Sequence, residues 1–181
     1  MAKLVVGAVV FVVLLIVIWY ISTSNSIKVA GLKVDESESG IDVALTKRYD
    51  VLTKMLDTVK GYQQYEKSVL TDMVRLRKGM TIDEKNQANA AMDKIAGDIR
   101  VLAENYPQLK ADNTFVQLQK AIVDVEEHLQ AARRLYNSNV NRCNSKIVVF
   151  PNSIVANGMG AVKRELFVAE EYKRQDVKMQ F

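Results

Sequence analysis

The sequence predicts an all-α protein, in which an N-terminal transmembrane helix is followed by an elongated antiparallel up-down bundle of about four helices. Three observations predict this class. Residues 4–21 carry no charged side chain. Downstream of them, apolar residues recur every three or four positions, as on one face of a helix. The 181 residues include only two prolines and eight glycines, and almost no stretch alternates as a strand does.

The membrane segment is residues 4–21, LVVGAVVFVVLLIVIWYI. A helix rises ~1.5 Å per residue, so this segment covers about 27 Å, close to the hydrocarbon thickness of a bilayer. Trp19 and Tyr20 stand at its downstream end, where amphipathic rings prefer the headgroup layer. Membrane lipid is therefore an expected partner of residues 4–21.

Two other interpretations of this segment compete with a retained anchor. A cleavable signal peptide has an apolar core of about 7 to 15 residues and a small-x-small site, of which Ser22-Thr23-Ser24 is a poor version. A buried core helix is the other alternative. The balance of Lys3 against Lys28 and Lys33 gives little orientation signal, and the short lead before Lys3 favours an extracytoplasmic bulk domain.

The remaining chain is nearly neutral, since all acidic residues lie from Asp35 onward and only three of the 25 basic residues precede it. Basic and acidic residues are mixed along every segment, which argues against nucleic acid as a partner. The expected divisions are an anchor over residues 1–24, a stalk or helix continuation over 25–38, a helical bundle domain over 39–168 and a tail over 169–181.

Two arrangements remain open where the anchor meets the bundle. Ile27, Val34 and Ile41 are seven residues apart, which suggests that the membrane helix continues into the domain past Gly31. Alternatively, Ser39 caps a new helix.

The first bundle helix is expected from Ile41 to about Lys78, with Gly79 as its stop. Thr81-Ile82-Asp83-Glu84 reads as a capping box that starts the second, and Pro107 ends it. The expected inner face of the second helix is Ala88, Ala91, Ile95, Ile99, Leu102 and Tyr106.

Asp112 or Asn113 can cap the third helix, and Pro151 ends it and opens a fourth. The face of the third helix is expected to be Phe115, Leu118, Ile122, Val125, Leu129, Ala132, Tyr136, Val140, Cys143 and Ile147. The fourth helix is expected to carry Ile154, Val155, Val162, Leu166 and Phe167.

Several stretches, in order and over essentially the whole chain, carry a resemblance to a known family. They are Ser39 to Val43, Lys47 to Asp50, Thr58 to Tyr62, Ala103 to Pro107 with Leu109 to Ala111 and Phe115, Ala132-Arg133 with Tyr136-Asn137, Val140, Asn144 and Ile147, Phe150-Pro151 with Gly160 and Phe167, and Val177 to Phe181. Together they resemble the LemA family of bacterial membrane proteins. Glu38, Thr53, Lys54 and Cys143 depart from its pattern, so a kink of the first helix, and any site built on it, does not carry over.

The resemblance implies a single-pass protein of the bacterial cell membrane with a helical bundle and no catalytic activity. It also implies a membrane protease or another envelope protein as a partner. The residues themselves agree: His128 and Cys143 lie about 22 Å apart along one predicted helix, too far for a catalytic pair. No metal-ligand spacing or phosphate-binding loop occurs in the sequence, so neither metal nor cofactor is expected.

Polar residues interrupt the apolar faces, and they form the candidate site. They are Arg48, Glu66, Arg133, Asn137 and Asn144, and Tyr49 of the apolar face is a further candidate beside Arg48. The simplest interpretation is a set of hydrogen bonds and ion pairs that fix the register between helices. Arg48, Tyr49, Arg133 and Asn137 could instead form a small anion or peptide site, and a homo-oligomer seam is the third alternative.

The function expected from these features is that of a membrane-anchored scaffold or adaptor, which acts by protein–protein contact and can associate with its own copies. A small-ligand or ion sensor that uses the polar seam is the alternative. An enzyme is not expected.

Overall fold

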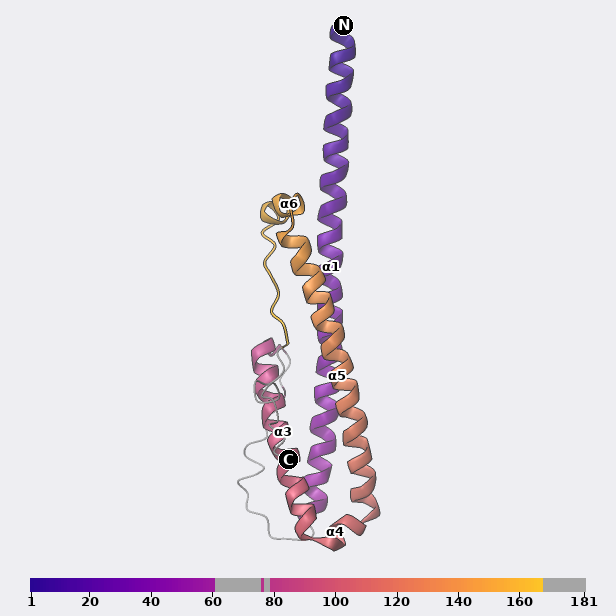
Figure 1. Cartoon of the computed structure of the whole chain (residues 1–181), viewed down its shortest axis with the longest axis vertical. Helices are drawn as coiled ribbons and strands as arrows, with labels where there is room; N and C mark the ends of the chain where they lie inside the picture. Colours follow the sequence, from indigo (N-terminus) through magenta and orange to yellow (C-terminus); the bar gives the residue numbers. More distant parts are fainter. Residues whose placement is uncertain (61–75, 77–78, 168–181) are drawn as a thin grey trace, which may run out of the picture. The chain divides into compact units, whose positions relative to one another are not determined.

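The computed structural model describes residues 1–60, 76 and 79–167. Its helices are α1 (Ala2–Lys60), α3 (Ile82–Asn105), α4 (Pro107–Ala111), α5 (Asn113–Val148) and α6 (Asn152–Gly158), as Figure 1 shows. No strand occurs within these described ranges, which confirms the all-α prediction.

The chain forms two compact units. The first unit contains Met1–Glu38 and Leu135–Glu165, and the second contains Ser39–Arg134 and Leu166–Phe181. Helices α1 and α5 each contribute residues to both.

Helix α1 continues without a break past Ser39, so the helix that contains the apolar segment is also the first helix of the bundle. This is the first of the two arrangements that the sequence left open. The expected extension to Lys78 falls mostly outside the described residues, but Leu76 is described and is not helical.

Burial along α1 changes abruptly near Thr23. The large apolar side chains from Leu4 to Ile18 are 46–79 % exposed, whereas Thr23 is the first buried side chain of the helix. From there burial recurs every three or four residues, as at a helix–helix seam. The buried side chains are Thr23, Ile27, Ala30, Val34, Ser37, Ile41, Ala44, Leu45, Arg48, Leu52, Met55, Leu56 and Val59.

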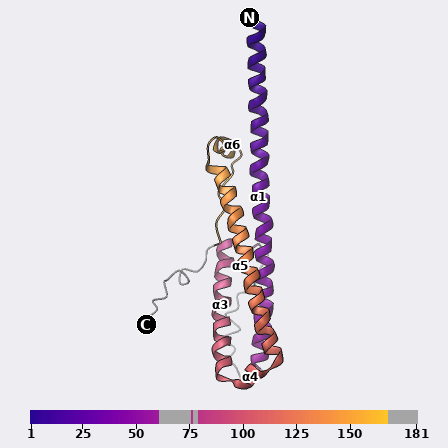
Figure 2. The same ribbon diagram turned by 45° about the vertical axis from the view of Figure 1, so that its right-hand side comes forward.

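In the second unit, the last part of α1 packs against α3 and α5. Asp42 pairs with Lys85 at 2.7 Å, and Arg48, further along α1, reaches Asp93, further along α3, so these two helices run in the same direction. Helix α5 runs opposite to both, as the two views in Figures 1 and 2 agree.

The capping box at the start of α3 is confirmed. The Glu84 backbone N–H donates to the Thr81 hydroxyl at 3.2 Å, and the Thr81 N–H donates to the Glu84 carboxylate at 2.8 Å. Helix α3 ends at Asn105, and Pro107 occupies the first turn of α4. On the predicted inner face, Ala88, Ile95 and Ile99 are buried, Ala91, Leu102 and Tyr106 are half-buried, and the prediction missed Met92 and Ala103.

Helix α5 is capped by Asp112, whose carboxylate accepts a hydrogen bond from the Phe115 N–H at 3.1 Å. Most of its predicted face is buried, and the half-buried members are Leu118, Ile122 and Ala132.

The predicted fourth helix is wrong beyond Gly158. Gly160 takes φ +65°, a left-handed conformation that favours glycine, and the Ala161 N–H turns back to the Ala156 carbonyl at 3.0 Å. Residues 161–167 are not helical, and Val162 is 75 % exposed. The turn at Gly160 therefore ends α6, although Val162 and Leu166 keep helical spacing.

Candidate functional site

Arg48 lies at the centre of the second unit, where one guanidinium joins three helices. The residue is 1 % exposed. It forms ion pairs with Asp93 on α3 and Glu126 on α5, and it donates to the Asn89 side chain and, at 3.3 Å, to the Asn89 carbonyl. Because a buried charge is costly unless it is paired and hydrogen-bonded, these partners fix the register of α1, α3 and α5. We call Arg48, Asn89, Asp93 and Glu126 the charged cluster.

The charged cluster is open to solvent on one side. The Arg48 side chain is 2 % exposed, whereas the carboxylates of Asp93 and Glu126 belong to side chains that are 15 % and 36 % exposed. The Arg48 Nε is buried and has no hydrogen-bond partner among the described residues. The cation is therefore held on its two terminal nitrogens.

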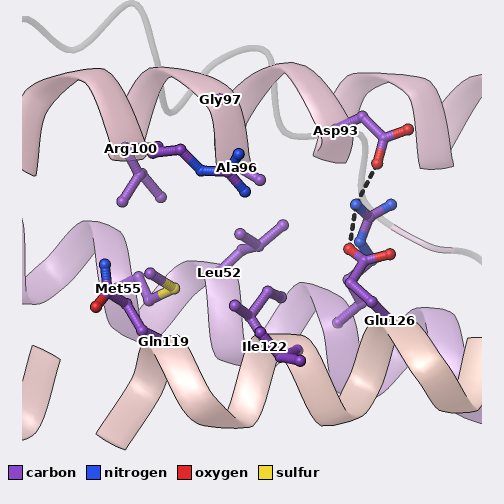
Figure 3. Close-up of a pocket in the computed structure, with 12 residues that line it drawn as sticks. Leu52, Met55, Asp93, Ala96, Gly97, Arg100, Gln119, Ile122 and Glu126 are labelled. Carbon is purple, nitrogen blue, oxygen red and sulfur yellow. Dashed lines mark hydrogen bonds and ion pairs between the residues drawn. The ribbon is translucent and has the colours of Figure 1, made fainter. Parts of the chain in front are cut away.

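A cavity of about 590 Å³ lies beside the charged cluster, between α1, α3 and α5 (Figure 3). Its wall is mostly apolar, and the apolar side chains are Leu52, Met55, Ala96, Ile99, Ile122 and Val123. Figure 3 shows the ion pairs of Asp93 and Glu126 at one end, and Arg100 with Gln119 toward the other.

This arrangement suits an amphipathic small molecule. Ligand cavities are typically about 300–1,000 Å³, mainly apolar, with a few polar groups that orient the ligand. Arg100 and Gln119 supply hydrogen-bond donors that an anionic or carbonyl group can use. Groups of three or more His, Cys, Asp or Glu side chains suited to a metal ion are absent from the described part of the chain.

In the first unit, Asn144 and Tyr136 on α5 hold the extended residues 161–165, which we call the strap. The Asn144 side-chain oxygen accepts from the Arg164 N–H at 2.8 Å, and its amide nitrogen donates to the Arg164 carbonyl at 2.9 Å. The Tyr136 hydroxyl donates to the Glu165 carbonyl at 2.9 Å. These side chains pair with the strap backbone much as a neighbouring strand would.

Two ionisable side chains of the first unit have shifted pKa values. Burial, followed by the nearby negative charge of Glu38, raises the pKa of Tyr136 to about 12. Burial also raises the pKa of the Cys143 thiol, which lies on the buried face of α5. Both effects favour the neutral forms.

The other predicted site residues lie in different settings. Arg133 stacks on the Phe167 ring, with its guanidinium carbon 4.7 Å from the ring centre. Tyr49 and Asn137 are half-buried. Glu66 lies outside the described residues.

These residues do not make one compact polar site. Glu126, the α5 partner of Arg48, is seven residues from Arg133, about 10 Å along the helix. Asn137 and Asn144 belong to the first unit, whereas Arg48, Tyr49 and Arg133 belong to the second. The cluster residues that the sequence analysis missed are Asn89, Asp93 and Glu126. A signal existed for two of them, because Asn89 and Asp93 are four residues apart and flank the apolar Met92 on α3.

The structure defines a class of protein in which a long, exposed, apolar N-terminal helix continues directly into a bundle of packed helices. A sequence model of the LemA family matches residues 37–181. The chain therefore belongs to the LemA family. It is also similar to Protein LemA of Metamycoplasma hominis, with 28 % identity over 163 residues, which cover 87 % of this chain and 74 % of that protein.

Proposed function

We propose that this protein is a membrane-anchored helical scaffold or adaptor that acts through protein–protein contact, including contact with its own copies. In this proposal, residues 4–21 span a bacterial cell membrane once and the bundle lies on the extracytoplasmic side. A membrane protease or another envelope protein is the candidate partner, and no catalytic step is assigned to the protein. Anchoring would confine its binding surfaces to one plane and raise their effective concentration.

The observation that carries the proposal is the exposure of the apolar segment. The described part of the chain contains one helix long and apolar enough to cross a membrane, and none of its most apolar window is buried within the protein. A contiguous apolar surface of this size is unfavourable in water. Lipid would cover it, and the seam of buried residues begins only at Thr23.

The polar groups of the bundle support a role in contact rather than in chemistry. The Arg48 guanidinium and the Asn144 amide are both engaged with neighbouring helices or backbone. His128 is exposed, and the Cys143 thiol is buried with a raised pKa, which disfavours the nucleophilic thiolate.

Site-specific photocrosslinking in intact cells tests the scaffold function. A crosslinking amino acid would replace exposed Val101 on α3 or exposed Leu135 on α5, and replacement of buried Leu129 would serve as the matched control. The proposal predicts defined adducts at an exposed position and none at Leu129. Absence of adducts from both exposed positions, in a chain that remains in the membrane, would contradict it. Protease accessibility of the bundle in whole cells tests its side of the membrane.

The cavity beside the charged cluster favours a second candidate function, that of a small-ligand sensor. Its probe is anilinonaphthalene sulfonate, an aromatic anion whose fluorescence rises in apolar sites. We expect saturable binding to the native chain, weaker binding to Arg100→Gln and none to Ile122→Trp, which fills the cavity. Equal binding by all three proteins, with unchanged helix content, would count against the sensor.

A further inference from the structure

In the first unit, the end of α5 and helix α6 lie beside α1 close to the end of its apolar segment (Figures 1 and 2). A Cβ atom placed on Gly158 of α6 would be 3.9 Å from the Tyr20 hydroxyl. Lys146, near the end of α5, donates to the Ser26 carbonyl at 3.4 Å. These contacts place the α5–α6 connection level with residues 20–26 of α1, at the downstream end of the segment that would span the membrane.

Large apolar side chains are exposed around this connection. Phe150 is 76 % exposed, and Ile154 on α6 is 59 % exposed. We call the whole set the apolar tip, and its members are Val148, Val149, Phe150, Ile154 and Val162. The opposite side of the same connection packs inward through Ile147, Val155 and Ala156. The tip is therefore an outward apolar surface on an ordered support.

Among the residues that the structure describes, the charge around the apolar tip has a single sign. The sequence contains no acidic residue before Asp35, and none between Glu127 and Glu165. Exposed cations at this end of the unit are Lys28, Arg142 and Lys163. An exposed apolar surface with a basic surround is complementary to the headgroup layer of an anionic membrane.

We propose that the apolar tip enters the headgroup layer of the same bilayer that α1 spans, and that the surrounding cations bind anionic phospholipid. The inference rests on the proposed membrane anchoring, because Tyr20 then lies at the membrane interface and the tip lies level with it. The tip would give the bundle a second attachment point on the membrane surface, in addition to the α1 helix.

A fluorescence measurement on the full chain in vesicles tests this inference. Single cysteines would be placed at Phe150, Leu135 and Val12 in a Cys143→Ala background and labelled with the environment-sensitive dye NBD. Leu135 is the matched control, since it is 59 % exposed on α5 in the same unit but far from the α5–α6 connection. Val12 reports the membrane span itself. Phospholipids that carry a nitroxide on the headgroup or on the acyl chain then quench any dye that contacts the bilayer at that depth.

We expect quenching and a blue shift at positions 12 and 150, and neither at 135. Quenching at 150 should be stronger with phosphatidylserine than with phosphatidylcholine alone, should fall with added salt, and should weaken in Lys163→Glu. If position 12 is quenched but position 150 is quenched no more than position 135, the tip inference is overturned and the anchoring remains intact. No quenching at 12 would refute the anchoring itself. A blue shift at 150 that depends on protein concentration, without lipid quenching, would indicate self-contact and also overturn the inference.

Discussion

At the scale of single residues, Arg48 contributes most to the arrangement of the second unit. Its side chain is buried where an apolar residue would ordinarily sit, and its partners come from two other helices. A guanidinium that satisfies carboxylates on α3 and α5 at once excludes other registers of these helices, because a shift of one turn would leave the charge unpaired.

We therefore expect Arg48→Met to destabilise the bundle by roughly 2 kcal/mol, below the range for a fully buried pair because Asp93 and Glu126 remain partly exposed. The measurement is denaturant unfolding of the full chain in mild detergent, followed by helical circular dichroism. Lys47→Met, on the adjacent exposed position, is the control and should change stability little. Equal stability of the two variants would show that the charged cluster contributes nothing.

Cys143 should react slowly with thiol reagents. It is 3 % exposed, and burial raises the pKa of its thiol, so both access and thiolate fraction are low. A Ser145→Cys variant in a Cys143→Ala background provides an exposed thiol two residues away on the same helix. Its labelling rate should greatly exceed that of Cys143 in the native chain, and comparable rates would contradict the buried placement.

Tyr136 should make stability depend on alkaline pH. Its folded-state pKa of about 12 lies above the ordinary 10.0, so the folded chain favours the neutral phenol. The stabilisation that the raised pKa of Tyr136 contributes is fully present below about pH 10 and is lost as the pH rises toward 12. We expect this alkaline loss to be smaller in Tyr136→Phe than in the native chain. Identical pH profiles of stability for the two proteins would show that Tyr136 does not contribute to the alkaline loss.

At the scale of elements, local signals predicted the helix boundaries well wherever neighbouring residues determine them. The Thr81–Glu84 capping box, the Asp112 cap and the interruption at Pro107 all depend on side chains within a few residues of the backbone that they satisfy. The predicted end of the fourth helix was wrong because the helical spacing of Val162 and Leu166 concealed a local stop at Gly160, whose left-handed turn ends α6. Val162 and Leu166 keep helical spacing, but Asn144 and Tyr136, distant in sequence, satisfy the strap backbone in an extended form.

Removal of the Asn144 amide should release the strap. In Asn144→Ala, the Arg164 N–H and carbonyl lose both of their partners, at a cost of about 1 kcal/mol per hydrogen bond. Hydrogen exchange of the Arg164 amide should accelerate, while exchange in the middle of α5 stays slow. Asn141→Ala, at an exposed position of the same helix, is the control. Unchanged exchange at Arg164 in Asn144→Ala would refute the strap contact.

The candidate site was only partly predictable for a similar reason. Arg48 and Asn144 stand out in the sequence because each interrupts an apolar face. Their partners stand out less. Asn89 and Asp93 are four residues apart on α3, but Glu126 and the Arg164 backbone have no distinguishing feature until the register of the helices is known. The cavity beside Arg48 depends on three separate helices and has no signature in any one of them.

At the scale of the whole molecule, α1 is the element that contains both the proposed membrane anchor and the first helix of the bundle. Its first third is apolar and exposed, and its remainder supplies one side of both packed units. Within the first unit, the buried seam of α1 begins at Thr23, directly after the segment that would span the membrane in the proposed anchoring.

The most direct test of the central claim is the mass and membrane retention of the chain from cells. After an alkaline carbonate wash, which strips peripheral proteins, we predict that the protein stays in the membrane pellet with residues 1–24 still attached. A Val12→Lys, Ile16→Lys double variant should be lost from that pellet, since two charges oppose insertion. A soluble mature chain that begins near Ser24 would contradict the account.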